Sequence, residues 1–169
     1  AGTIPFSFGM FKLYEGKNYN LMEADINFYF EELRQDFEGS CLGMYFLEYV
    51  DYYTHENIDE TLMLKLLFQS LKAITAEQIP NDLIRYVFEI KALVVNGEFP
   101  GIPTQMRLLE STSYAISYIV DSSIEKLYTF NVSTEVLNEL RRVSDYYRSR
   151  YIDKKFKSLE ILEKCMLKM

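Results

Sequence analysis

Residues 61–76, Thr-Leu-Met-Leu-Lys-Leu-Leu-Phe-Gln-Ser-Leu-Lys-Ala-Ile-Thr-Ala, decide the fold class. Their polar side chains form a single narrow stripe at helical spacing, made of Thr61, Lys65, Gln69 and Lys72. A helix that is apolar on all its other sides lies inside a protein core. We therefore expect a mainly α-helical protein in which this helix, capped by Asp59, is central.

Helical periods continue on both sides of this stretch. A first helix is expected over 26–37, ending at Gly39, and a second is expected from a cap at Ser40 to Tyr53. The remaining helices are expected from 80 to a stop at Gly97, from Ser111 or Ser113 to 120, over 124–130, from a Ser133 cap to 152, and over 156–167. The pattern predicts a helical domain over 25–169 with about seven to eight helices.

Residues 1–24 have a different pattern. Phe6, Phe8 and Met10 alternate with smaller residues, and Glu15-Gly16-Lys17-Asn18 has the composition of a turn. The segment predicts a β-hairpin. Because a lone hairpin is marginally stable in water, it must pack against something else.

The composition excludes several classes. The 169 residues include 14 Tyr and 12 Phe but only 7 Gly and 4 Pro, which is too few turn formers for an all-β protein. No apolar run approaches the ~18 residues of a membrane span, and no signal peptide is apparent. Two cysteines make no disulfide framework, so we expect a reducing, cytoplasmic setting. The first residue is Ala1 and not Met, from which we expect a trimmed chain.

Charge is unevenly distributed along the chain. The net charge is −7, yet residues 141–169 carry nine basic and four acidic groups, a net charge of +5. The other 140 residues therefore carry −12. Since phosphate binding depends on Lys and Arg, the acidic body does not suggest a chain that wraps nucleic acid by itself.

The sequence contains no catalytic or metal-binding pattern. The single histidine, His55, lacks a visible partner for base catalysis and is expected at the surface. Cys41 and Cys165 do not have the spacing of a zinc site, and the glycines at 39 and 43 lack the lysine of a phosphate-binding loop. We expect neither an enzyme nor a cofactor.

Two cationic features remain as candidate binding sites. The first is a basic and aromatic segment, which is a candidate for binding nucleic acid or an acidic partner and contains Arg141, Arg142, Arg148, Arg150, Lys154, Lys155 and Lys157. The second is the pair Arg85 and Lys91 on the otherwise apolar fourth helix, beside Ile84 and Phe88. The alternatives are a solvated helix face for the segment and a simple pair with Glu89 for Arg85.

Several motifs resemble the RecO family of bacterial recombination mediators. Residues 45–51, Tyr-Phe-Leu-Glu-Tyr-Val-Asp, resemble its Tyr-Phe-Leu-Glu-Leu-Val-Asp signature, and residues 88–93 resemble its Phe-Glu-Leu-Arg-Leu-Leu helix. Residues 97–100 resemble its Gly-Tyr-x-Pro segment, and residues 157–162 its closing Lys-Ser-Leu-x-x-Leu. Together the motifs cover most of residues 10–165.

The resemblance implies a fold and a function. Family members join an oligonucleotide-binding (OB) barrel to a helical domain, so the hairpin of residues 1–24 would be the end of a barrel whose first strands are missing. They bind single-stranded DNA and act with RecR to load RecA, in the cytoplasm and at the nucleoid. They also bind the acidic, Phe-ended tail of single-strand-binding protein on the helical domain, where Arg85 and Lys91, with Ile84 and Phe88, would be the counterparts.

The chain departs from the family at one place. Many relatives have a four-cysteine zinc site after the Gly-x-x-Pro segment, but residues 102–107 here are Ile-Pro-Thr-Gln-Met-Arg, so no zinc is expected. The alternative to the resemblance is an unrelated helical adaptor for an acidic protein, with the shared motifs arising from core packing.

Overall fold

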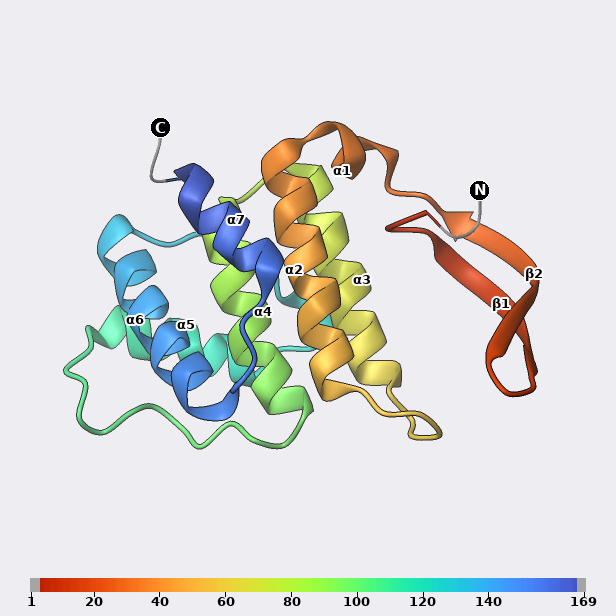
Figure 1. Cartoon of the computed structure of the whole chain (residues 1–169). Coiled ribbons are helices and arrows are strands. Elements are labelled where there is room, and N and C mark those ends of the chain that lie inside the picture. The colour runs from red at the N-terminus through yellow and green to blue at the C-terminus, as the bar shows by residue number, and fades with distance from the viewer. Residues whose placement is uncertain (1–3, 167–169) are drawn as a thin grey trace.

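Ten elements make up the computed structural model, which describes residues 4–166 and, of their side chains, those of residues 4–164 (Figure 1). In this range the chain forms β1 (Phe8–Glu15), β2 (Tyr19–Phe28), α1 (Glu31–Gln35), α2 (Phe37–Tyr53), α3 (Thr61–Ala76), α4 (Asn81–Val95), α5 (Glu110–Asp121), the 3-10 helix η1 (Ile124–Lys126), α6 (Thr134–Tyr151) and α7 (Lys157–Met166). The expected mainly helical fold with an N-terminal hairpin is confirmed.

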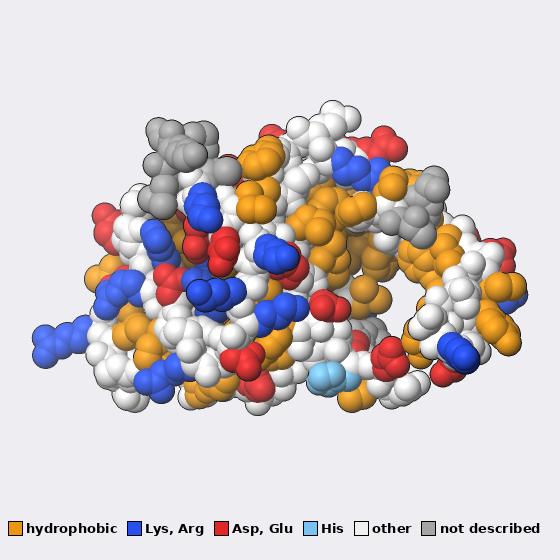
Figure 2. Space-filling view, in the orientation of Figure 1, with side chains coloured by type: hydrophobic (Ala, Val, Ile, Leu, Met, Phe, Trp, Pro, Cys, Tyr) orange, Lys and Arg blue, Asp and Glu red, His pale blue; other side chains and the backbone are white. Residues whose placement is uncertain are grey.

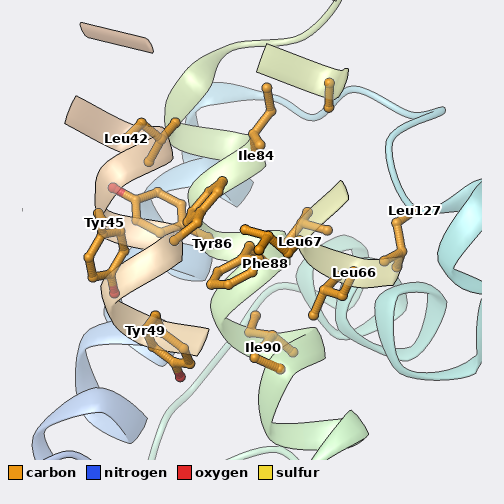
Figure 3. Close-up of a cluster of buried hydrophobic side chains, with 14 of the residues drawn as sticks. Leu42, Tyr45, Tyr49, Leu66, Leu67, Ile84, Tyr86, Phe88, Ile90 and Leu127 are labelled. Carbon is orange, nitrogen blue, oxygen red and sulfur yellow. The ribbon is translucent and has the colours of Figure 1, made fainter. Parts of the chain in front are cut away.

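Helix α4 occupies the centre of the helical part. Every residue from 83 to 93 is buried, and α4 packs against α2, α3, α5 and α6. Figure 3 shows Leu42, Tyr45 and Tyr49 of α2 in one buried cluster with Ile84, Phe88 and Ile90 of α4. The expectation that residues 61–76 form the central helix is therefore wrong. Leu62 and Leu64 of α3 stay about half exposed because α3 lies at the edge of the group of helices and not at its centre.

The long helices end where local chemistry predicts. Ser133 caps α6 by accepting a hydrogen bond from the Val136 N–H at 3.4 Å. Gly97 follows α4 with a φ of 75°, the left-handed conformation that favours glycine after a helix. The expected start of α4 after Pro80 is also found, and residues 98–109 form a loop without helix or strand.

The first two helices differ from the expectation. Strand β2 continues to Phe28, so no helix spans 26–37, and α2 starts at Phe37 because Asp36 accepts hydrogen bonds from the N–H groups of Glu38 and Gly39. Gly39 therefore lies inside α2, where a Cβ atom would stand 2.4 Å from Oδ2 of Asp36. Ser40 does not cap a helix, since its hydroxyl donates to the Leu33 carbonyl.

Smaller differences occur near the C-terminus. Residues 124–130 form only the short η1, where a longer helix was expected. The last helix begins at Lys157, and the expected end at Leu167 lies outside the described residues. These differences leave the order and packing of the long helices unchanged.

The hairpin is held to the helices mainly at its base. Phe8, Phe28 and Phe30 gather around Phe68 of α3, with ring centroids 4.6 to 5.6 Å from Phe68. At the other end the Tyr19 hydroxyl donates to Glu56, in the loop between α2 and α3, at 3.3 Å. Between these points the hairpin stands away from the helices, and Figure 2 shows a hollow bordered by hydrophobic side chains.

One face of the hairpin is apolar. In the antiparallel register Phe11 pairs with Ala24, and Leu13 pairs with Leu21, which places these side chains on one face. Phe11, Leu13 and Leu21 are each exposed by 43 to 52%. Tyr19, on the same face, reaches Glu56, so this face turns toward the helices across the hollow.

Candidate partner-binding surface

A buried carboxylate, that of Glu89 on α4, organises the charges near the core. Its Oε1 atom lies 2.9 Å from Arg85 Nε and 3.4 Å from Arg148 Nη1 of α6. The Tyr45 hydroxyl of α2 donates to the same oxygen at 2.7 Å, and the Ser144 hydroxyl donates to Oε2. Three helices therefore meet at one side chain that is only 3% exposed.

The ionisation of Glu89 follows from these partners. Burial disfavours the charged carboxylate, but the guanidinium groups of Arg85 and Arg148 and the Ser144 hydroxyl outweigh burial and hold the pKa of Glu89 below its ordinary value. Tyr45 responds in the opposite direction, since burial and the Glu89 charge raise its pKa well above the ordinary value. At neutral pH the cluster thus contains an ionised Glu89 and a neutral Tyr45.

The acidic-peptide site expected on the fourth helix needs correction. Ile84 and Phe88 are fully buried in the core, where the Phe88 ring stacks on Phe46 with centroids 4.0 Å apart. Arg85 is 5% exposed and is already bound to Glu89 and, through Nη2, to Glu163 of α7 at 3.1 Å. These side chains hold helices together and present no surface, because α4 is covered on all sides.

Lys91 has a structural role of its own. Its Nζ atom donates to three carbonyl oxygens at the end of α5, those of Ile119, Val120 and Ser122, at 3.1, 2.8 and 2.7 Å. Burial lowers the pKa of this amine, while Asp121 raises it to a smaller extent. Lys91 therefore satisfies carbonyls that a helix C-terminus leaves unpaired.

Part of the basic segment, where α6 ends and α7 begins, does form a surface. A cleft of about 290 Å³ lies between the two helices, with Ile152, Phe156 and Leu159 as its apolar lining. Arg148, Lys154 and Lys155 line it from the basic segment, together with the carboxylates of Asp145, Glu160 and Glu163. Figure 2 shows this mixture of basic and acidic side chains over α6 and α7.

The cations of this cleft differ in how firmly they are held. Arg148 is fixed by Asp145 at 2.8 Å, by Glu89 at 3.4 Å and by Glu163 at 3.9 Å. Lys154 approaches Asp51 at 3.9 Å. Lys155 is exposed, and within residues 4–164 it has no carboxylate at ion-pair distance, so its charge faces water.

The other predicted cations lie outside the cleft. Arg141 and Arg142 are exposed on the first half of α6, where Arg141 approaches Asp145 at 3.8 Å. The Arg150 guanidinium lies 4.3 Å from the centre of the Tyr146 ring, a cation–π contact. Lys157 is exposed at the start of α7. The structure thus brings together Arg148, Lys154 and Lys155 and leaves the others spread along two helices.

Sequence reasoning missed the cluster at Glu89. The pair of Arg85 with Glu89 was visible from its spacing, but Tyr45 and Ser144 come from helices far away in the sequence. A glutamate inside the apolar stretch 83–93 was the available signal, because a buried charge needs partners. No group of three or more potential metal ligands occurs among the described residues.

The fold and the cleft describe a mainly helical protein with an N-terminal hairpin and a surface cleft of mixed basic, acidic and apolar lining. Comparison with known families then specifies its kind. Residues 34–102 and 103–160 match the model "Recombination protein O C terminal", so the chain belongs to this family, which serves DNA repair. That match sets aside the alternative of an unrelated adaptor.

Curated relatives agree with this assignment. The DNA repair protein RecO of Acetivibrio thermocellus is 24% identical over 197 residues, which cover 96% of this chain and 78% of the relative. RecO of Clostridium novyi is 24% identical, with 95% and 75% covered, and RecO of Clostridium perfringens strain SM101 is 25% identical, with 95% and 85% covered. No solved structure matches the chain. No helix in the described residues has the length and hydrophobicity needed to cross a bilayer.

Proposed function

We propose that this chain acts in DNA repair as a non-enzymatic recombination mediator, whose helical part docks the acidic tail of single-strand-binding protein in the cleft between α6 and α7. With RecR it would load RecA onto single-stranded DNA, in the cytoplasm at the nucleoid. The observation that carries the proposal is a cleft with apolar side chains at its base, lined by Arg148, Lys154 and Lys155 together with three carboxylates, of which Asp145 and Glu163 are engaged by arginines. The relatives support the role in DNA repair, because they carry the name DNA repair protein RecO.

The cleft has the chemistry that an acidic, Phe-ended peptide requires. A buried aromatic anchor supplies most of the energy of such contacts, and the surrounding charges set orientation and association rate. Ile152 is half-buried, with Phe156 and Leu159 buried at the base of the cleft, so the apolar area on offer is small, and a volume of about 290 Å³ suits one side chain better than a larger substrate. The exposed Lys155 would meet the peptide's carboxylates.

Arg85 keeps an indirect part in this proposal. Buried Arg85 forms an ion pair with Glu163, whose carboxylate lines the cleft. Arg148 lies 3.9 Å from the same Glu163 oxygen. With Glu163 and Asp145 engaged by arginines, the acidic residues at the cleft are partly neutralised. Arg85 is thus a positioning residue, and Lys154 and Lys155 are the ones that would contact the peptide.

Single-stranded DNA would bind mainly elsewhere. The apolar face of the hairpin, with Phe11, Leu13 and Leu21 about half exposed, suits packing inside an oligonucleotide-binding barrel. We propose that the hairpin, which runs to Phe28 and not to residue 24, belongs to such a barrel. The helical part would then bind DNA weakly, through the basic segment, in a way that added salt abolishes.

A peptide titration tests the docking site. Calorimetry would compare an acidic peptide ending in Phe with the same peptide ending in Ala, each titrated into the whole chain. The Phe-ended peptide should bind at least about tenfold more tightly, since a buried aromatic anchor dominates such sites. Lys155→Glu should weaken its binding by about tenfold, whereas Lys17→Glu, at the exposed hairpin turn, should not. Equal affinities for all three proteins would remove the cleft from the proposal.

A second titration tests DNA binding. Fluorescence anisotropy with a labelled oligo-dT should show weak binding that disappears at high salt. Joint neutralisation of Arg150, Lys154 and Lys155, three exposed cations, should reduce it further, and circular dichroism would confirm the fold. Tight binding that salt leaves unchanged would contradict the proposal.

A further inference from the structure

A second surface, distinct from the cleft between α6 and α7, runs along the outer side of α5. A cavity of about 750 Å³ lies between α5 and the start of α6, lined mainly by Tyr114, Tyr118, Phe130, Val132 and Val136. A neighbouring cavity of about 480 Å³ shares Tyr114 and Tyr118 and continues to the end of α5. The two form one groove, which we call the α5 groove.

The α5 groove has the composition of a protein-binding surface. Its outer stripe, at positions 110, 111, 114, 117 and 121, is exposed at helical spacing, and Tyr114 is 74% exposed. The stripe has Tyr114 between Ser111 and Ser117, with Glu110 and Asp121 at its ends, and the groove also contains Asn131. Rigid aromatic rings among small polar groups are typical of surfaces that bind peptides.

The Tyr118 ring is fixed in place. Its hydroxyl donates to the Lys126 carbonyl at 3.2 Å and lies 3.0 Å from the Thr129 hydroxyl, and its ring meets Phe130 edge-on with centroids 5.1 Å apart. Tyr118 and Phe130 therefore form a preformed aromatic wall, and the groove needs little rearrangement to accept a partner.

The charge of the groove is negative at its larger cavity. Glu110 is the one charged residue that lines this cavity, and Asp121 and Lys126 line the smaller one. Glu135 is exposed in the first turn of α6, next to Ser133 and Val136 of the lining. A cationic partner complements this arrangement and an anionic one does not.

Helix N-termini do not reverse this preference. Both α5 and α6 begin at the larger cavity, and helix N-termini attract anions. Carboxylates of the chain already fill this role, since Glu139 accepts from the Leu109 N–H at 2.9 Å. A hydrogen bond from its own backbone N–H and one from Ser133 hold the pKa of Glu135 below its usual range.

We propose that the α5 groove docks a partner-protein segment in which aromatic or aliphatic anchors are flanked by arginine or lysine. The anchors would contact Tyr114, Tyr118 and Phe130, and the cations would meet Glu110 and the ring faces. This partner has the opposite charge to the peptide proposed for the cleft between α6 and α7. The two surfaces would let one chain bind an acidic and a basic partner at once. Because they share no residue, an experiment that disproves one binding site leaves the other untouched.

A single tryptophan provides the test. The chain has no Trp, so the whole protein with Tyr114→Trp carries one fluorophore in the groove. The probe is an end-capped Gly/Ser peptide with two phenylalanines between arginines, compared with the same peptide bearing glutamates instead. The arginine peptide should shift the Trp emission to the blue and saturate, whereas the glutamate peptide should not. No response to the arginine peptide, or equal binding of both, would overturn the proposal.

Charge and anchor variants then locate the site. In the Tyr114→Trp protein, Glu110→Lys should weaken the arginine peptide by about tenfold. Glu31→Lys is its matched control, because Glu31 is likewise in the first turn of a helix, and should leave affinity unchanged. With Tyr114→Ser, which removes the ring and adds no charge, labelled arginine peptide should no longer bind, and the circular dichroism spectrum should match that of the original chain. If sedimentation shows instead a dimer that Tyr114→Ser dissociates, the occupant is a second copy and the proposal fails.

Discussion

Helix α4 and the segment from α6 to α7 both carry basic residues among aromatic ones, but the cations of α4 are buried and those of the segment are mostly exposed. On α4, Arg85 and Lys91 are 5% and 6% exposed, and each is bound to groups from other helices. On the α6–α7 segment, Lys154 and Lys155 are exposed, and the pairing of Lys154 with Asp51 is long, at 3.9 Å. The comparison teaches that a cation marks a binding surface only when no element of the same chain covers it.

The largest effect is expected at the centre of the buried network. Glu89→Gln leaves Arg85 and Arg148 without their shared countercharge and should lower the free energy of unfolding by about 3–5 kcal/mol. Urea denaturation followed by circular dichroism measures this. Glu160→Gln, on the exposed side of α7, is the control and should be neutral. A loss at Glu89 no larger than at Glu160 would show that the network does not stabilise the fold.

The same network predicts a pH dependence. Because the pKa of Glu89 is lower in the folded chain, its contribution is fully present above the ordinary glutamate pKa of about 4.3. The contribution is lost as the pH falls through the folded value. Thermal melts from pH 7 downward should therefore show a constant gap between the original chain and Glu89→Gln, which narrows only in acid. A gap that already narrows near neutral pH would contradict the assigned direction.

A somewhat smaller effect is expected at Lys91. Lys91→Met keeps the apolar part of the side chain but removes donors to three carbonyls of α5, which should cost about 2–3 kcal/mol. Hydrogen exchange should show the end of α5 opening more often. Lys17→Met, in the hairpin turn, serves as the exposed control. If the amides of α5 exchange no faster in the Lys91→Met variant than in the original chain, then water satisfies the three carbonyls as well as the amine does, and Lys91 does not stabilise α5.

A still smaller effect is expected at the Tyr45 hydroxyl. Tyr45→Phe removes one donor to Glu89 and leaves Arg85, Arg148 and Ser144 in place, so the expected loss is about 0.5–1.5 kcal/mol. The loss should vanish in the Glu89→Gln background if the two groups act through one another. Additive losses in the double variant, measured by urea denaturation, would separate Tyr45 from the network.

The smallest effect on stability is expected in the basic segment. The double variant Lys154→Glu and Lys155→Glu should unfold at the same urea concentration as the original chain, because both amines are exposed. Its affinity for the acidic peptide should nevertheless fall, and the difference should shrink in high salt. A stability loss as large as that at Lys91 would show that the two regions do not differ in kind.

Much of the fold could be predicted from local patterns. The Ser133 cap, the stop at Gly97 and the start after Pro80 fixed two long helices, because caps and helix breakers act within a few residues. The cap at Asp36 is local as well, since its carboxylate accepts from the N–H groups of Glu38 and Gly39, but Ser40 matched the same rule and was preferred. The strand over 26–28 could not be predicted locally, because Phe28 packs on Phe68 of α3, and Gly39 likewise lies close to Ile74 of α3. These contacts join parts of the chain that the local pattern does not connect.

The sequence by itself determined the helical class, the hairpin, the family motifs at 45–51 and 88–93, and the basic segment of residues 141–157. Only the tertiary structure decided that α4 and not α3 is central, that Arg85 and Lys91 are bound internally, and that Lys155 remains exposed. The physical reason is that helical periodicity states which side chains share a face. Whether that face meets water or another helix depends on packing between residues distant in the chain, as Tyr45, Glu89 and Ser144 show.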